Sequence, residues 1–375
     1  MKYRFFFSIT CLALALALFI CGCPSDEGSP AYSGSEKEKK GTTDTDTDTD
    51  SDTDTDTDSD SDSDMDTDSD SDDEEEGPME PDCTECASSL TGNSLEAMLC
   101  AVDLCGECVL DTQFASPTNA RTNGAYAAVA RFGAQTNELE PLYNGSYALM
   151  ATGTATGTNH SVDMGGSSQN DEFANDSSRP TNDVMEWSIR LKAPEGAHGF
   201  QIHYVFFSEE YDEYVGSRYN DKFYIFLEAP STNGGERTVI NFTKCRGGYA
   251  GDVICNQTLE DMGLCTQGDK LCYIAINTAL SECCWYGGCT TSNQNTDITG
   301  TGYSCGTKLQ DGLIGGDKYG SSTGWLKTEW PIEPEEEFNV IFHIHDTSDH
   351  ILDSEVIIDK FWFVGKPDPG TTPLE

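Results

Sequence analysis

Two acidic segments of the chain could do chemistry. The first, SEEYDEYVGSRYNDKF at residues 208–223, lies between two apolar runs and carries the carboxylates of Glu209, Glu210, Asp212, Glu213 and Asp221. The second, HDTSDHILDS at residues 345–354, carries Asp346, Asp349 and Asp353. If two such segments met at the ends of neighbouring strands, they would repel each other unless a cation lay between them. Calcium is the favoured ion, because it takes about six to eight oxygen ligands from irregular loops.

The sequence therefore predicts a calcium site. Its predicted ligands are Glu209, Glu210, Asp221, Asp346, Asp349 and Asp353. No EF-hand spacing is present, so the prediction depends on the fold bringing the two segments together. The alternative is that both segments are solvated turns of an acidic protein. Asp212 and Glu213 fit that alternative best.

Paired carboxylates also serve in glycoside hydrolysis, which places two of them roughly 5–10 Å apart across a cleft. Glu209 or Glu210 could face Asp221 or Asp353 in this way. The adjacent pair cannot act together, because neighbouring side chains of an extended chain point to opposite faces. Nucleophile-elbow and HExxH signatures are absent from the sequence. We therefore favour a protein that binds without catalysis, and a secreted carbohydrate-active hydrolase is the alternative.

Histidines and aromatic residues offer weaker candidates. His343 and His345 share one strand face and could chelate zinc or copper, with His350 in the following loop. Two ordinary strand histidines are the favoured interpretation of that spacing. Four aromatic residues could stack on sugar rings or pack in a core, namely Trp285, Tyr286, Tyr319 and Trp325.

The elements that would position these groups are strands. In VMEWSIRL, residues 184–191, apolar Met185, Trp187, Ile189 and Leu191 alternate with polar residues, which is the two-residue period of a half-buried strand. FQIHYVFF, KFYIFL, FNVIFHIH and EVIIDKFWF follow, separated by turn-forming residues. Residues 113–367 are therefore predicted to form an all-β domain, an antiparallel β-sandwich of jelly-roll type.

Sixteen cysteines point to an oxidising compartment. Three of them, Cys11, Cys21 and Cys23, lie in the first 23 residues. A predicted small module at residues 83–112 carries Cys83, Cys86, Cys100, Cys105 and Cys108, and an insert at residues 245–305 carries Cys245, Cys255, Cys265, Cys272, Cys283, Cys284, Cys289 and Cys305. We expect disulfides in both groups. The two C-x-x-C pairs of the first group also match a zinc ribbon, which is the alternative there. The odd total leaves one thiol over or one bridge between the groups.

The chain begins with basic MKYR and an apolar run from Phe5 to Ile20, which is too short to span a bilayer and is typical of an export signal. The following ICGC resembles the lipobox of bacterial lipoproteins. Residues 1–22 are thus the predicted signal peptide, and Cys23 is the predicted lipid-modified N-terminus. An ordinary secretory cleavage site nearby is the alternative. We expect the lipid to be the protein's only attachment to a membrane.

Residues 23–82 are predicted to form a disordered stalk. From Thr42 onward the segment is almost wholly Thr-Asp and Ser-Asp dipeptides, which are too polar to fold and repel one another. The chain carries a formal net charge of −45, and the part beyond the stalk is acidic too. Nucleic acids and anionic lipid surfaces are excluded as partners, because both attract Lys and Arg.

Several motifs carry a family resemblance. ALMATG, YVFFSEEYDEYVGSRYNDKFYIFL and FNVIFHIHDTSDHILDSEVII resemble the choice-of-anchor L domain over roughly residues 140–363. The resemblance implies an exported bacterial surface domain with no settled activity. The insert at 245–305 and the segment LQDGLIGGDKYGSSTGW depart from the family pattern. We therefore expect a lipoprotein at the bacterial cell envelope, on the outer-membrane surface, that binds a surface glycan or a protein.

Overall fold

The structure is a computed structural model of the chain. It describes residues 86, 91–132, 139–155, 163–166, 169–173, 179–211, 214, 216–245, 251–276, 278, 301, 303 and 320–374. The predicted signal peptide, Cys23 and the whole of the predicted stalk lie outside these ranges, as do Cys83, Cys283, Cys284, Cys289 and Cys305. Within the described ranges, no helix is long and apolar enough to cross a membrane.

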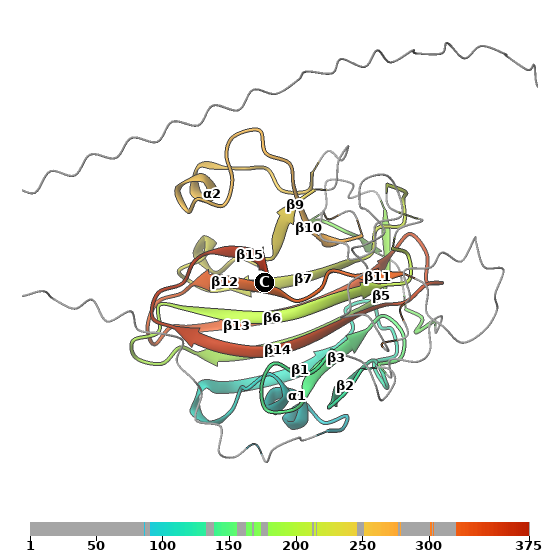
Figure 1. The fold of residues 1–375 in the computed structure, drawn as a ribbon, viewed down its shortest axis with the longest axis horizontal. Helices are drawn as coiled ribbons and strands as arrows, with labels where there is room; N and C mark the ends of the chain where they lie inside the picture. The colour runs from blue at the N-terminus through green and yellow to red at the C-terminus, as the bar shows by residue number, and fades with distance from the viewer. Residues whose placement is uncertain are drawn as a thin grey trace, which may run out of the picture. The chain divides into compact units, whose positions relative to one another are not determined.

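Two antiparallel sheets form the body of the described structure (Figure 1). The first sheet has the order β1 (Val109–Ala115), β5 (Pro180–Lys192), β13 (Glu337–Thr347), β7 (Lys222–Glu228), β10 (Leu271–Ala275) and β9 (Phe242–Lys244), with β4 (Gln169–Asn170) on β5 and β8 (Thr238–Val239) on β7. The second has the order β15 (Gly370–Pro373), β12 (Leu326–Pro331), β6 (Gly199–Ser208), β14 (Ser354–Val364), β3 (Tyr147–Ala151) and β2 (Tyr126–Val129), with β11 (Ser321–Ser322) on β6.

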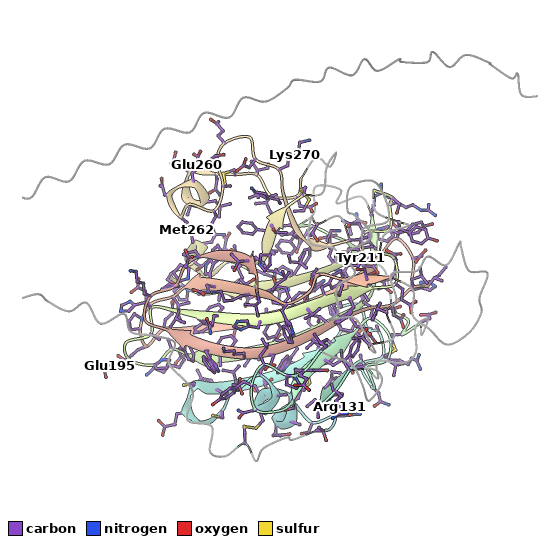
Figure 2. The ribbon with its side chains drawn as sticks, in the orientation of Figure 1. Arg131, Glu195, Tyr211, Glu260, Met262 and Lys270 are labelled. Carbon is purple, nitrogen blue, oxygen red and sulfur yellow. A yellow bond between two sulfur atoms is a disulfide. The ribbon has the colours of Figure 1, made fainter. Side chains whose placement is uncertain are left out.

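The core lies between the sheets. The strands alternate as the sequence predicts, so that Trp187 of β5 and Phe342 of β13 point inward and are fully buried. Tyr204 of β6 and Phe223 of β7 meet across the two sheets with ring centroids 5.2 Å apart. Side chains fill the space between the ribbons (Figure 2). The predicted all-β class and antiparallel β-sandwich are confirmed.

Short helices accompany the sheets. The first, α1 (Leu95–Ala101), is capped by the Ser94 side chain, which accepts a hydrogen bond from the Ala97 amide. Its Met98 packs into the main core, so this part of the predicted Cys-rich module shares the core of the sandwich. The second, α2 (Gln257–Asp261), lies in the cysteine-rich insert, and two 3₁₀ turns occupy Gly106–Cys108 and Asn233–Gly235.

Disulfides join the described cysteines in both predicted groups. The described pairs are Cys86–Cys100, Cys245–Cys272 and Cys255–Cys265, and Cys105 is also disulfide-bonded. The bond between Cys245 and Cys272 ties β9 to β10, and the other bond of the insert encloses α2. Cys108 is a correction to the sequence analysis, which placed it among the disulfides, because it is a free thiol. Thirteen cysteines lie beyond residue 23, so at least one of them has no partner for a disulfide within that set.

Candidate functional site

A cluster of carboxylates lies at one end of the sandwich, where strands of both sheets end. The inward positions of β7 and β13 include Phe223 and Ile344. Side chains alternate along a strand. Asp221, two residues before Phe223, and Asp346, two residues after Ile344, therefore face the same inner side. Glu209 and Glu210 follow the end of β6, and Asp353 directly precedes β14, in the opposite sheet. The end of the sandwich therefore collects acids from four strands.

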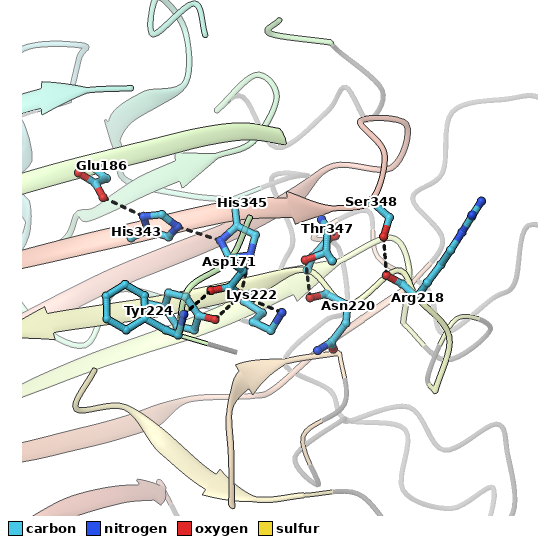
Figure 3. A network of polar contacts seen from close by, with 12 residues as sticks. Asp171, Glu186, Arg218, Asn220, Lys222, Tyr224, His343, His345, Thr347 and Ser348 are labelled. Carbon is cyan, nitrogen blue, oxygen red and sulfur yellow. Dashed lines mark hydrogen bonds and ion pairs between the residues drawn. The ribbon is translucent and has the colours of Figure 1, made fainter. Parts of the chain in front are cut away.

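Hydrogen bonds join the two acidic segments. Asp221 accepts from the Thr347 amide at 2.8 Å and from the Ser354 hydroxyl at 2.7 Å. The Thr347 and Ser348 hydroxyls donate to the carbonyls of Asn220 and Arg218, each at 2.8 Å (Figure 3). The two segments, more than 120 residues apart in sequence, thus meet as the calcium prediction requires.

The cluster is buried. Glu209, Glu210, Asp221, Asp346 and Asp353 are each at most 4% exposed, whereas Asp349 is half-buried at the edge. In the described part of the chain, neither oxygen of Asp346 has a hydrogen-bond partner of normal geometry, and the same holds for Oε2 of Glu210. A buried carboxylate without partners is unstable in its charged form, so each must take up a proton or meet a cation.

The pKa values show how far the cluster departs from ordinary acids. Burial and the neighbouring Asp221 raise the pKa of Glu210 well above its usual range. Burial likewise raises the pKa of Asp221 to about 7, although hydrogen bonds from Thr347 and Ser354 oppose the rise. The pKa of Asp346 is raised well above normal by burial and then by Asp221 and Asp353. The local environment thus opposes negative charge on all three groups.

The negative charge of Asp221 adds to burial in raising the pKa of Glu210, so these two carboxyl groups repel each other when both are charged. A proton on one of them, or a cation between them, would relieve that repulsion. Within the described ranges, however, no three His, Cys, Asp or Glu side chains stand around a common point as ligands of one metal ion. Occupation of this end by calcium would require the carboxylates to turn toward the ion.

Glycine permits the close packing of Asp353. A Cβ atom placed on Gly153 would lie 1.9 Å from Asp353 Oδ2. Any larger residue at position 153 must therefore displace the carboxylate. The loop after β3 is shaped to admit this acid into the interior.

A second polar cluster lies on the opposite face of the first sheet. His343 Nδ1 is 2.9 Å from Glu186 Oε1, and His343 Nε2 is 2.8 Å from His345 Nδ1 (Figure 3). Asp171 completes the row, since its Oδ2 is 3.6 Å from His345 Nε2 and 3.2 Å from Lys222 Nζ. The histidines are thus bonded to each other and to acids, as expected of structural strand histidines.

Charges balance in this second cluster. Although burial opposes it, His345, Lys222 and the Tyr224 hydroxyl hold the pKa of Asp171 below its ordinary value. Against the same opposition, His343 and Arg237 lower the pKa of Glu186. Both acids are therefore stable as anions. Sequence analysis missed Asp171, because nothing in QNDEF distinguishes its acid from a loop residue.

Two cavities adjoin the outer face of this sheet. The smaller, about 170 Å³, is lined by the histidine cluster. The larger, about 690 Å³, lies between the sheet and the disulfide-linked insert. Its lining combines apolar and polar groups, among them Phe242, Leu259, Met262, Tyr273, Asn233 and Arg237. Figure 2 labels Met262 beside α2. Cavities of this size and mixed lining are typical of ligand sites.

The remaining candidates differ in their placement. Asp212, Glu213, Trp285, Tyr286 and Tyr319 lie outside the described residues. Trp325 is half-buried and packs against a hydrophobic cluster. His350 is exposed near Asp163. Asp183, which sequence analysis did not consider, is 2% exposed and contributes to the raised pKa of Asp346. Its place at the start of the VMEWSIRL strand is the one signal available in the sequence.

Together, the fold and the buried acids define a disulfide-linked antiparallel β-sandwich with an acidic end. The model of the Choice-of-anchor L domain matches residues 89–363, which is more than half of the chain. The chain therefore belongs to the choice-of-anchor L domain family, as its motifs predict. Membership indicates a surface-associated or extracellular module. No curated protein matches the chain.

Proposed function

We propose that this chain is a surface-anchored extracellular binding or adhesion module, without catalytic activity, that calcium stabilises at the acidic end of its sandwich. The observation that carries the proposal is the burial of Glu210, Asp221 and Asp346 together. Among the described residues, none of the three has an ion pair, and neither oxygen of Asp346 has a hydrogen-bond partner of normal geometry. A divalent cation supplies the missing positive charge. Glu209 and Asp353 complete the oxygen donors from the second sheet, and Asp349 lies at the edge.

Calcium bound here would link two sheets. Because the ion binds the folded chain and not the unfolded one, it stabilises the fold by RT ln(1 + [Ca]/Kd), about 2.7 kcal/mol at 100 times Kd. Exported modules bind calcium with Kd of roughly 10⁻⁴ to 10⁻³ M. The fold of such a protein is therefore more stable outside the cell, where calcium is available.

Burial argues against the hydrolase alternative. A catalytic carboxyl must touch the glycosidic oxygen or the anomeric carbon of its substrate. Glu209, Glu210, Asp221 and Asp353 are at most 4% exposed and face the interior between the sheets. A glycan cannot reach them without opening the sandwich. The same burial suits a structural ion.

The ligand surface is proposed to be the 690 Å³ cavity between the sheet and the insert. The rings of Phe242 and Tyr273 with the polar groups of Asn233 and Arg237 suit a surface glycan or a protein segment. Disulfides hold the insert in place, which limits the entropy lost on binding. Retention on glycan or protein arrays without turnover would support this assignment, and release of reducing sugar would contradict it.

The attachment is proposed to be lipid on Cys23, with the acidic stalk as spacer and the cell envelope as the location. Expression with a labelled fatty acid tests this. We expect label in the wild-type chain and none in Cys23→Ser. Label retained by the variant would contradict the lipid assignment.

The calcium proposal is tested by melting the oxidised full chain in calcium, in magnesium and in chelator. We expect calcium to raise Tm by several degrees and magnesium to do so weakly, because magnesium demands a tight octahedral shell. Asp346→Asn should abolish the calcium response, and Asp212→Asn should keep it. Equal melting curves in calcium and chelator would contradict the proposal.

A further inference from the structure

A second place with buried acids lies on the other sheet. Asp359 of β14 is five residues beyond Ser354, the residue that bonds Asp221, so about 17 Å of strand separates it from the acidic end. Ile358 points into the main core, whereas Ile357 packs in a separate cluster on the opposite face of the second sheet. Side chains alternate along a strand, so Asp359 lies on that opposite face. It therefore takes no part in the acidic end.

Asp103, which follows α1, lies beside Asp359. The Leu142 amide donates to Asp359 Oδ2 at 2.6 Å, and the side-chain amide of Asn144 donates to Asp103 Oδ1, also at 2.6 Å. The carbonyl of the residue before Asp103 accepts a hydrogen bond from the Phe361 amide at 2.9 Å. One loop and one backbone contact thus hold the two carboxyl groups together, and both acids are 0% exposed.

The basic groups nearest in sequence and in register do not balance Asp359. Lys360 lies in the bulge of β14 with φ of 51°, and its ammonium group lies over the Trp362 ring, 4.2 Å from the centroid. His203 of β6 pairs directly with Asp359, but burial lowers the pKa of this histidine to about 4, so it is neutral at pH 7. In the described part of the chain, Asp359 Oδ1 has neither an ion pair nor a hydrogen-bond partner of normal geometry.

The two oxygens of Asp359 differ in their surroundings. The amides of Leu142, Tyr143 and Lys360 all donate to this carboxyl, and they serve Oδ2 because Oδ1 has no partner. Burial raises the pKa of Asp359 well above its ordinary value against the effect of the Leu142 amide, and Asp103 adds to the rise. One fully buried oxygen therefore requires either a proton or a cation.

From this geometry we infer that Asp103 and Asp359 form a second calcium site, on the outer face of the second sheet. Two carboxylates match the charge of the ion, and calcium completes its six to eight ligands with carbonyls and water. A site of two acids agrees with the finding that no three His, Cys, Asp or Glu side chains gather as ligands in the described ranges. An ion can enter through the covering loop, where Leu142 is 38% exposed and Asn144 is exposed.

Sensitised luminescence of terbium tests the site in the oxidised, chelator-treated full chain. Terbium prefers the same oxygen ligands as calcium and emits when an excited tryptophan lies nearby. The Trp362 ring lies against Tyr143, with centroids 5.1 Å apart, and the Tyr143 amide donates to Asp359. Residues 42–82 of the predicted stalk contain no Trp or Tyr, so terbium on their carboxylates adds no sensitised signal.

The component of the emission that Trp362→Phe removes is the signal of this site, and calcium chloride should displace it. Asp359→Asn keeps an acceptor for the amides and removes the charge, so the terbium Kd from this signal should rise at least about tenfold. Asp111→Asn is the matched control, because Asp111 is an exposed aspartate on β1, and the Kd should not change. Asp346→Asn should also leave the Trp362 signal unchanged, since the acidic end is a separate place.

The outcomes separate this inference from the proposed function. A Trp362 signal that is absent from the wild type, or that keeps its Kd in Asp359→Asn, overturns the second site alone. Absence of the calcium-dependent rise in Tm with the Trp362 signal intact overturns the site at the acidic end alone. If Asp359→Asn does not fold, a wild-type crystal grown in calcium decides, because Asp359 Oδ1 should lie about 2.3–2.6 Å from an ion. A crystal with no ion on Asp359 overturns the inference.

Discussion

The two faces of one sheet differ in whether their buried acidic groups have partners of opposite charge. On the outer face, Asp171 and Glu186 have cationic or hydrogen-bonding partners in Lys222, Arg237 and the histidines. On the inner face, Asp221 and Asp346 have no ion pair among the described residues. Strands β7 and β13 contribute to both faces at alternate positions, because Lys222 and His345 lie on the outer face, whereas their neighbours Asp221 and Asp346 lie on the inner one. A balanced cluster is part of the framework, whereas an unbalanced one requires something from outside.

Neighbouring residues show the contrast most directly. Lys222 follows Asp221, and its ammonium group lies on the outer face beside Asp171. His345 precedes Asp346 and likewise contacts the outer cluster. One step along the chain therefore separates a satisfied group from an acid without a counter-charge. This alternation keeps the ammonium group of Lys222 on the outer face of the sheet, where it pairs with Asp171 and not with the inner carboxylates.

The largest expected effect comes from breaking the balance of the outer cluster. Lys222→Met leaves Asp171 without its ammonium partner, and both side chains are at most 4% exposed. Removing one member of a buried pair costs about 3–5 kcal/mol, so the free energy of unfolding in urea should fall by that amount. Lys192→Met is the control, because its pair with Glu335 is exposed and worth less than about 1 kcal/mol. Equal losses of unfolding free energy in the two variants would show that the buried pair of Lys222 and Asp171 contributes no more to stability than the exposed pair.

The next prediction breaks the geometry of the inner cluster without changing its charge. Gly153→Ala places a methyl group against Asp353, and overpacking of this kind costs roughly 1–3 kcal/mol. The calcium-dependent rise in Tm should also shrink, because Asp353 must move. A double-mutant cycle with Asp353→Ala checks the cause, since removing the carboxylate should remove the added cost. If the two changes were fully additive, the cost of Gly153→Ala would not come from its contact with Asp353.

The dependence of stability on pH sharpens the comparison further. The raised pKa of Asp221, about 7, means that its folded form holds a proton that the unfolded form loses near pH 4. In chelator, the free energy of unfolding should therefore fall between about pH 4 and 7, by up to about 1.4 kcal/mol per pH unit for such a group. Asp171 and Glu186 have lowered pKa values, so their contribution is present above the unfolded pKa and is lost as pH falls below about 4.

Urea unfolding of the wild type and of Asp221→Asn across this pH range isolates the contribution of Asp221 to the free energy of unfolding. The variant should show a shallower fall toward neutral pH, because its amide does not titrate. Calcium should reverse the trend in the wild type, since the ion requires deprotonated carboxylates. Identical slopes for the two proteins in chelator would contradict the assignment of the fall to Asp221.

The sequence determined the strands and the acids on them. VMEWSIRL, KFYIFL and FNVIFHIH carry the two-residue period strongly, because half-buried strands must expose every second residue, and each appears as β5, β7 and β13. The acidic segments were found for the same reason, since five carboxylates between apolar runs stand out by composition alone. Family motifs in these same strands were recognisable for their residue types and order.

Tertiary structure alone decided which groups meet. Asp221 and Thr347 are 126 residues apart, and only the pairing of β7 with β13 brings them within 2.8 Å. Asp171 gave no signal, and Asp183 gave none beyond its place before the VMEWSIRL strand, because a loop contact and a bulge depend on register, which no local pattern encodes. The bond between Cys245 and Cys272 likewise follows from the pairing of β9 with β10. Local periodicity is a property of neighbouring residues, whereas charge balance in the interior is set by distant ones.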